Sequence, residues 1–291
     1  CNSGAEANEN ALKLASFVTG RAGIICFDKG FHGRTAAAVA ATDNPRIQAG
    51  INAGQEIYRL PLNDLAAVEQ CLQEQEVAAL IVEPIQGVGG LDTASDQFLQ
   101  GCARLCKTHG ALLIADEVQT GYGRSGQFFA HQQAGIKPDL ITIAKGMGNG
   151  FPVGGVLIAP DIAPWHGMLG TTFGGNHLAC AAALAVLEVL EQESLITAAG
   201  HQGDYLYAAL AAIPGVKAVK GRGLMLGAQL DFPVAGLRKR LVLEQHHFTG
   251  AATDKHLLRL LPPLSISQGQ IDTFIQALQT EISHELNTVR S

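Results

Sequence analysis

The sequence predicts an α/β protein with a mostly parallel sheet in a large N-terminal domain, followed by a smaller α+β domain. Apolar runs of four to six residues alternate with helical patterns through the first 190 residues. Strands that are apolar throughout and joined by helices are typical of a parallel sheet that is covered on both faces. The last hundred residues carry short strands and helices without that alternation. We therefore expect a large domain over residues 1–190 and a small domain over residues 191–291.

The first predicted element is a helix that begins at Gly4. Ser3 and Glu6 have the S-x-x-E spacing of a capping box, which satisfies the free N–H groups of a helix start. From Ala7 onward the apolar residues follow a helical period, and Gly20 ends the pattern.

The following elements are predicted from apolar runs and helix caps. Buried strands are expected at 24–27, 77–82, 111–115, 139–144 and 155–159, and helices at 64–75 (after Asn63), 96–109 (after Ser95) and 178–192. The second part is expected to contain a helix at 197–212, strands at 216–220 and 224–230, a helix at 234–246 and a terminal helix from Gln268. Cys102 and Cys106 share a helix face and can bind a metal, but a buried apolar face is the simpler interpretation. We expect no metal.

Composition excludes several classes of protein. Hydrophobic residues make up 47% and charged residues 16%, which is typical of a compact protein rather than a disordered one. The net charge of −6 gives no reason to expect nucleic acid or an anionic membrane as a partner. No apolar stretch is long enough to span a bilayer, and no signal peptide is recognisable. We expect a soluble, cytoplasmic protein.

Three predicted strands end on an ionisable residue, namely Glu83, Asp116 and Lys145. Ligands of open parallel sheets bind beyond the carboxyl ends of the strands. A single charge at a strand end is usually an ordinary surface residue, but three on neighbouring strands indicate a functional site.

Lys145 and Asp116 together indicate a class of cofactor. Lys145 precedes the glycine-rich turn GMGNG, where a partly dehydrated amine suits Schiff-base chemistry; a phosphate-binding or snorkelling lysine is the alternative. Asp116 can pair with a protonated pyridine nitrogen, and pyridoxal phosphate enzymes need both groups. The helix start at Ser3, Gly4 and Ala5 offers free N–H groups to a phosphate.

Six motifs, SGAEAN, FHGRT, EPIQG, ADEVQTG, IAKGMGNG and TTFGGN, occur in this order. Each is weak alone, but together they resemble the class III aminotransferases over essentially the whole chain. These are pyridoxal phosphate enzymes of fold type I, the aspartate aminotransferase-like fold. FHGRTAA and GTTFGGNHLAC are most similar to the acetylornithine aminotransferase group.

The resemblance implies roles around the cofactor. Lys145 would form the Schiff base and afterwards move the proton between substrate and cofactor carbons. Asp116 would pair with the ring nitrogen, Val118 and Phe31 would pack on the two ring faces, and Gln119 would reach the phenolic oxygen.

The resemblance also implies contacts for the phosphate and for the substrates. The phosphate would meet Ser3, Gly4 and Ala5, and Thr172 would reach the phosphate of a neighbouring subunit, which implies a homodimer. Arg259 would bind the substrate α-carboxylate, and Arg34 the distal carboxylate of glutamate or 2-oxoglutarate; a planar guanidinium suits such bidentate contacts.

Two departures from the family pattern affect the interpretation. The stretch QGVGG has Val88 where the family usually has a glutamate that pairs with the carboxylate-binding arginine. Arg259 is then permanently available, which disfavours ornithine as the substrate. Family members also carry a segment before SGAEAN, so we expect this chain to be a fragment or a truncated form.

The expected reaction is transamination of N2-acetylornithine with 2-oxoglutarate to N-acetylglutamate 5-semialdehyde and glutamate, in arginine biosynthesis. Succinylornithine, ornithine and 4-aminobutyrate are alternative donors. A different class of alternative is a non-catalytic remnant that binds a phosphate ligand or a partner. A nucleotide-binding doubly wound domain is a weak third reading, because no G-x-G-x-x-G or P-loop motif follows a strand.

Overall fold

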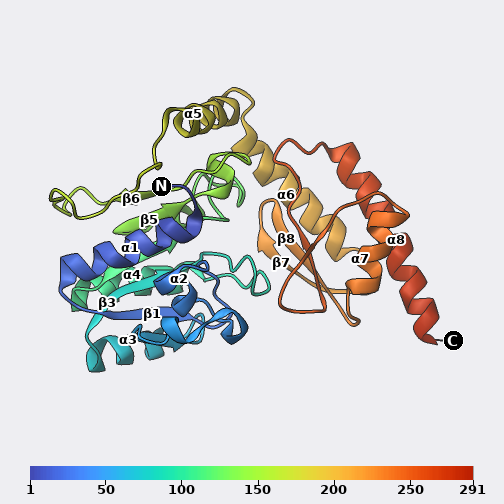
Figure 1. The fold of residues 1–291 in the computed structure, drawn as a ribbon. Helices are drawn as coiled ribbons and strands as arrows, with labels where there is room; N and C mark the ends of the chain where they lie inside the picture. Colours follow the sequence, from blue (N-terminus) through green and yellow to red (C-terminus); the bar gives the residue numbers. More distant parts are fainter. Residues whose placement is uncertain (291) are drawn as a thin grey trace.

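The computed structural model describes residues 1–290, with side chains for residues 1–286, and contains two separate sheets with their own helices (Figure 1). The first sheet has six strands in the order β2-β1-β3-β4-β5-β6. Its strands are β1 (Gly23–Phe27), β2 (Ile57–Leu60), β3 (Val77–Val82), β4 (Leu112–Asp116), β5 (Leu140–Ile143) and β6 (Gly155–Ile158). β1 to β5 are parallel and β6 runs antiparallel to β5. The predicted mostly parallel sheet is confirmed.

Helices cover both faces of this sheet, as apolar strands require. On one face α3 (Leu65–Glu74) and α4 (Asp96–His109) pack on the side chains of Ile25 and Leu80. On the other face α1 (Gly4–Thr19) and the short α2 (Ala36–Ala41) pack on the neighbouring residues Ile24 and Ile81. Successive residues of β1 and β3 therefore face opposite layers. Cys102 and Cys106 lie in the α4 core, as the apolar interpretation predicted.

Two helix starts differ in detail from the prediction. Ser3 caps α1 by accepting from the Glu6 N–H, but the Glu6 carboxylate accepts from the backbone N–H of Asn2 instead of closing the box on Ser3. The N-cap of α3 is Asp64, because Asn63 has a left-handed φ of 70° and its amide oxygen accepts from the backbone N–H of Ser95 instead.

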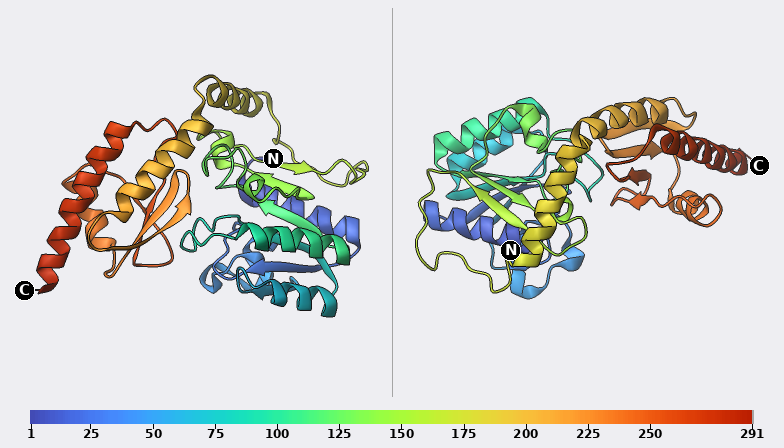
Figure 2. Two further views of the ribbon diagram at one scale, coloured as in Figure 1. Left: turned by 180° about the vertical axis from the view of Figure 1, so that it is seen from behind. Right: turned by 90° about the horizontal axis from the view of Figure 1, so that it is seen from above.

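The second sheet is antiparallel, with the order β7-β8-β10-β9. Its strands are β7 (Val216–Arg222), β8 (Met225–Leu230), β9 (Gly250–Ala251) and β10 (Leu257–Leu260), and its helices are α6 (Leu195–Ala211), α7 (Ala235–Leu243) and α8 (Gln268–Arg290). Apart from the short β9, these elements share one apolar core. Figure 2 shows this unit beside the first sheet and its helices. The predicted boundary near residue 190 falls between the two sheets and stays a prediction.

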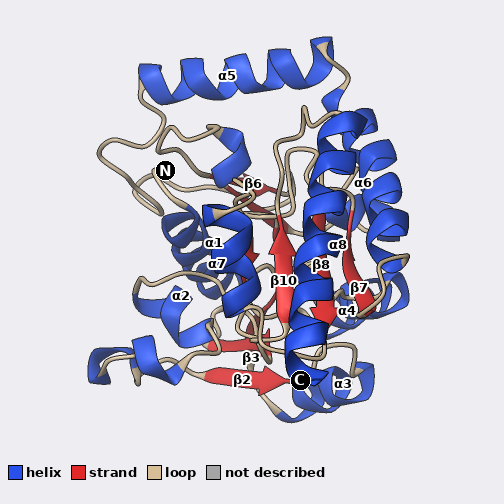
Figure 3. Ribbon diagram, turned by 90° about the vertical axis from the view of Figure 1, so that its right-hand side faces the viewer, coloured by secondary structure: helices blue, strands red, loops and turns tan. Residues whose placement is uncertain are grey.

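The helix α5 (His177–Gln192) lies across one end of the molecule, away from most of the other helices (Figure 3). Much of its apolar surface is open, with Leu178 72% and Leu184 56% exposed. None of the helices in residues 1–290 has the length and apolar character needed to cross a membrane.

Candidate active site

The three charged strand ends meet at one edge of the first sheet. β3, β4 and β5 are neighbours, so Glu83 after β3, Asp116 at the end of β4 and Lys145 after β5 lie side by side. All three line a pocket of about 430 Å³. The prediction that these residues converge is therefore correct.

Lys145 stands on a strained backbone at the mouth of this pocket. Its φ is 44°, a left-handed value that costs a non-glycine residue about 1 kcal/mol or more and is typical of functional sites. The residue is exposed to the space of the pocket, and the surrounding protein nevertheless desolvates its amine. Burial lowers the pKa of Lys145, and the positive charge of Arg259 acts in the same direction; Asp116 and Glu83 oppose it. A lysine with a lowered pKa supplies the neutral amine that a nucleophile needs.

Asp116 is buried and held by three donors. Asn8 on α1 donates from Nδ2 to Oδ2 (2.8 Å), and His32 Nδ1 lies 2.7 Å from the same oxygen. The backbone N–H of Val118 donates to Oδ1 (3.1 Å). Burial lowers the pKa of His32, but the hydrogen bond and the charge of Asp116 outweigh it, so the net shift is upward. This arrangement fixes the carboxylate in orientation.

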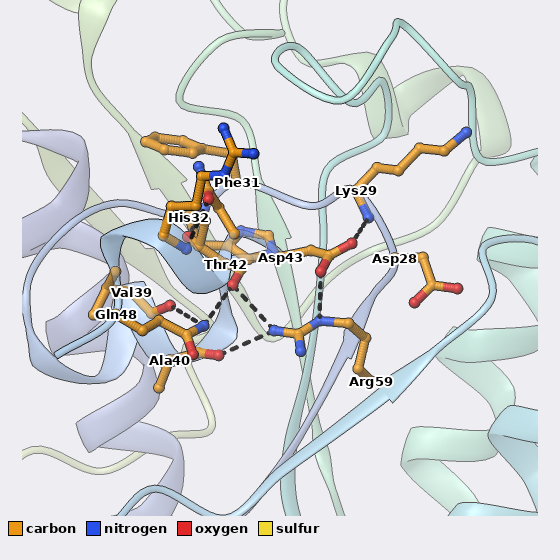
Figure 4. Close-up of polar contacts among 12 residues, drawn as sticks. Asp28, Lys29, Phe31, His32, Val39, Ala40, Thr42, Asp43, Gln48 and Arg59 are labelled. Atoms are coloured by element: carbon orange, nitrogen blue, oxygen red, sulfur yellow. Dashed lines mark hydrogen bonds and ion pairs between the residues drawn. The ribbon is translucent and has the colours of Figure 1, made fainter. Parts of the chain in front are cut away.

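Arg59 on β2 supports the segment that follows His32 (Figure 4). The backbone N–H of His32 donates to Thr42 Oγ1 (2.9 Å). Arg59 on β2 donates from Nη2 to the carbonyl oxygens of Ala40 and Thr42, at 3.1 Å each, and its Nε lies 3.7 Å from Asp43 Oδ1. The edge strand thus supports the histidine that orients Asp116.

Glu83 connects two loops of the pocket. Its Oε1 accepts from the backbone N–H of Phe31 (2.8 Å) and its Oε2 from that of Gly87 (3.0 Å). Burial, with the nearby charge of Asp116, raises the pKa of Glu83 to about 7, although His32 and the two N–H donors act against this shift. Glu83 is therefore poised to exchange a proton near neutral pH.

The N-terminus of α1 points into the same pocket. Gly4 and Ala5 line it, and their backbone N–H groups have no acceptor within the part of the chain that the structure describes. Free N–H groups and the positive end of the helix dipole favour an anion there. Buried beside Asp116, the Asn8 Oδ1 atom has no hydrogen-bond partner either. A phosphate site, a fixed carboxylate and an amine line one pocket, and they match the three polar ends of pyridoxal phosphate.

A second pocket, of about 960 Å³, adjoins the first and reaches the second sheet. Phe31, Gln119 and Lys145 line both. Arg259, on β10, lines the larger one together with Val88. Arg259 donates from Nη1 to the carbonyl oxygen of Gly87 (2.5 Å), and its Nε has no partner. Among the side chains of residues 1–286 it forms no ion pair, so its guanidinium is free to bind a carboxylate.

Of the eleven residues predicted for the site, nine line the smaller pocket: Ser3, Gly4, Ala5, Phe31, Arg34, Asp116, Val118, Gln119 and Lys145. Arg259 lies in the adjoining pocket. Thr172 lies outside both, exposed on the segment between β6 and α5, and Arg34 is exposed at the pocket. Their individual roles stay predictions.

Two residues that contact Asp116 were not predicted. Asn8 is a buried polar residue inside the apolar pattern of α1, which is an unusual position and was a usable signal. His32 belongs to the FHGRT motif, in which only its neighbours Phe31 and Arg34 had received roles. The contact was not predicted, because His32 and Asp116 lie far apart in the sequence.

Comparisons with known proteins identify the family of this chain. The family model described as aminotransferase class-III matches residues 1–282. An acetylornithine aminotransferase of Bacillus subtilis (strain 168) is 42% identical over 290 residues, covering 98% of this chain and 75% of the relative. One from Methanocaldococcus jannaschii is 40% identical over 291 residues, covering 96% of this chain and 72% of the relative.

Solved structures show the same fold. An ornithine aminotransferase from Toxoplasma gondii, with PLP at partial occupancy in its active site, matches with a TM-score of 0.92 at 28% identity, covering 100% of this chain and 72% of its own. A thermostable (S)-enantioselective omega-transaminase from Thermomicrobium roseum matches with a TM-score of 0.85 at 30% identity, covering 98% of this chain and 74% of its own. The predicted fold type and family are confirmed, and the chain belongs to the class III aminotransferases.

Proposed function

We propose that this chain transfers the amino group of N2-acetylornithine to 2-oxoglutarate with pyridoxal phosphate as cofactor, as a step of arginine biosynthesis. The relatives that are 40% and 42% identical over nearly the whole chain carry the name acetylornithine aminotransferase, which supports this substrate. The observation that carries the proposal is the meeting of Lys145, Asp116 and the free N-terminus of α1 in one pocket.

The cofactor supplies an electron sink for the bond-breaking step when it is bound. The chain contributes three fixed groups around it. When the cofactor is bound, Asp116, held by Asn8 and His32, would stabilise a positive charge on the ring nitrogen. Gly4 and Ala5 offer their N–H groups to the phosphate. The Nζ atom of Lys145 would hold the cofactor and, once released, would accept and return a proton, a task that its lowered pKa favours.

Arg259 and Arg34 are the proposed carboxylate contacts. Two arginines suit a five-carbon dicarboxylate such as 2-oxoglutarate or glutamate, because each carboxylate can take a bidentate contact. Val88 lines the pocket beside Arg259 and offers no charge that could occupy it. Arg259 is accordingly available to amino donor and oxo acid alike, and this favours an acylated ornithine over ornithine itself.

We also propose that the active form is a homodimer. Phe173, which follows Thr172, is 73% exposed, and Leu178 and Leu184 of the nearby α5 are also open. Exposed apolar surface of this extent is typical of an interface. If a second copy of the chain covered α5, Thr172 of this chain would lie close to the phosphate site of that second copy. Sedimentation at micromolar concentration tests the dimer.

The test of the proposed function is borohydride reduction of the chain loaded with pyridoxal phosphate, followed by peptide mapping. We expect a pyridoxyl adduct on Lys145 and none in Lys145→Ala, with transamination lost in the variant. Lys217→Ala is the matched control, since this lysine is exposed on β7 and paired only with Asp231 (2.8 Å). An adduct elsewhere would refute the site. Higher turnover of succinylornithine or 4-aminobutyrate than of acetylornithine would refute the substrate.

A further inference from the structure

The loop of residues 121–126, with the sequence GYGRSG, is one of the places where the first unit of the chain meets the second. It follows Asp116 and its neighbours Val118 and Gln119, and it leads into the large pocket through Tyr122 and Arg124. We call it the 121–126 loop. Its position between the lysine pocket and β10 gives it the opportunity to set their relative placement.

Glycines allow the 121–126 loop to touch the second unit at backbone distance. Gly126 has a φ of 84°, and a Cβ atom there would lie 3.1 Å from the Cα atom of Gly200 on α6. Gly223, in the turn between β7 and β8, has a φ of 57°, and a Cβ atom there would lie 2.6 Å from the nitrogen of Gly126. No side chain fits at this contact, so the backbones of the two units lie directly against each other. A small displacement of one unit towards the other would cause a steric clash.

Arg124 adds directional bonds to this contact. Its carbonyl oxygen accepts from the backbone N–H of Leu224 (3.0 Å), and its Nη1 donates back to the Leu224 carbonyl oxygen (3.1 Å). The same Nη1 donates to the carbonyl oxygen of Pro262 (2.5 Å). Pro262 lies three residues after Arg259 in the segment that continues β10. One side chain therefore ties the β7–β8 turn and the end of β10 to the loop after β4.

The charge of Arg124 has no ionic partner of its own. Among the side chains of residues 1–286, Arg124 forms no ion pair. Desolvation by the surrounding protein lowers the pKa of Arg124 to about 10. Desolvating a cation is costly unless polar groups compensate it, and here two carbonyl oxygens of the second unit do so. A half-buried arginine without an ion pair is not needed merely to fill this space, because a neutral side chain of similar size would avoid that cost.

We propose that Arg124 is a positioning residue that holds Arg259 in register with Lys145 and thereby determines how tightly substrate carboxylates bind. This inference rests on the proposed function of Arg259. Among the described residues, Arg259 itself has one hydrogen bond to the first unit, at Gly87, so its placement depends on the anchoring of β10. Arg124 lines the same large pocket, and it supplies that anchoring at the end of β10 through the carbonyl oxygen of Pro262.

The experiment measures glutarate binding by calorimetry in the cofactor-loaded chain, since this five-carbon dicarboxylate cannot react. Arg124→Met should weaken glutarate binding about tenfold, because the charged hydrogen bonds that hold the end of β10 are lost. Arg124→Lys, which can reach one carbonyl oxygen, should lose less. Arg222→Met is the matched control: Arg222 also joins the two units, but through an exposed contact to Asp96 at 3.8 Å, and it should change binding less than twofold.

Two further readouts separate positioning from general loss of structure. The affinity for pyridoxal phosphate should be unchanged in Arg124→Met, whereas hydrogen exchange should accelerate in peptides that cover residues 257–264. Equal losses of cofactor and glutarate affinity, or unchanged glutarate binding, would overturn the inference; Arg124→Lys decides the matter should Arg124→Met fail to fold. Wild-type chain that binds glutarate but does not transaminate acetylornithine would refute only the proposed function.

Discussion

The two ends of the pocket are built in different ways. At the cofactor end Asp116 is 3% exposed and receives three hydrogen-bond donors, all from the same unit of the chain. At the carboxylate end Arg259 comes from the other unit, has one hydrogen bond to the described residues of the first, at the Gly87 carbonyl oxygen, and leaves its Nε without a partner. One charge is fixed by its surroundings, while the other is free to meet a ligand.

The difference reflects the tasks of the two ends. A charge that must act on the same atom in every turnover benefits from preorganisation, since no reorganisation is then needed during the reaction. A charge that must release one carboxylate and accept another benefits from having no permanent partner. The contrast predicts that substitutions at the two ends have separable effects on rate and on binding.

The largest effect should come from Asp116→Asn. The amide cannot stabilise a positive charge on the ring nitrogen, so we expect transamination to slow by about 100-fold or more, while the cofactor still binds through α1 and Lys145. Single-turnover rates with a saturating amino donor measure this. Asp139→Asn is a control, because Asp139 accepts from the backbone N–H of Leu113 at the start of β4, far from the strand ends. Near-normal rates in Asp116→Asn would mean that the cofactor end is not organised around this carboxylate.

Arg259→Ala should act mainly on binding. We expect the KM values of the amino donor and of 2-oxoglutarate to rise together by about 10- to 100-fold, because one guanidinium serves both carboxylates in turn. Arg259→Lys should recover part of the loss, since an ammonium keeps the charge but not the fork. Steady-state kinetics with both substrates give the comparison, with the exposed Arg104→Ala as control. A variant that lost affinity for only one substrate would contradict the shared role.

The sequence predicted the cofactor end better than its supports. Glu83, Asp116 and Lys145 were predictable because each follows an apolar run, and parallel strands bring their carboxyl ends together. His32 and Asn8 were not, since they reach Asp116 from 84 and 108 residues away, and only the packing of α1 and the loop after β1 creates those contacts. Periodicity carries no information about such distant pairs.

The same limit applies to short, partly exposed elements. The strand β2 was missed because IYRL is brief and includes Arg59, whose charge disguises an edge strand. The anchoring of β10 was also beyond prediction, because Arg124 meets carbonyl oxygens 100 and 138 residues further along the chain. Backbone acceptors leave no mark in a sequence, since every residue carries one.

The smallest expected effect concerns stability and tests how tightly the cofactor end is organised. Because burial raises the pKa of Glu83 from 4.5 to about 7, the folded chain holds a proton in this window that the unfolded chain has released. Folding stability should therefore fall as the pH rises from 4.5 to 7, by up to about 1.4 kcal/mol per pH unit. The raised pKa of His32 acts in the same direction, since stability due to its protonated form is lost as the pH rises through that pKa.

Glu83→Gln should flatten this pH dependence, because the amide neither binds nor releases a proton. It should also lower stability at acidic pH by about 1 kcal/mol, since a single amide oxygen cannot accept from both Phe31 and Gly87. Urea unfolding between pH 5 and 7.5 measures both effects, with Glu69→Gln on the exposed side of α3 as the control. The slope should remain in the control and shrink in the variant. An equal pH dependence of stability in the wild type, the variant and the control would mean that Glu83 stays ionised when buried. The N–H groups of Phe31 and Gly87 would then be held by a charged carboxylate rather than by a neutral carboxyl group.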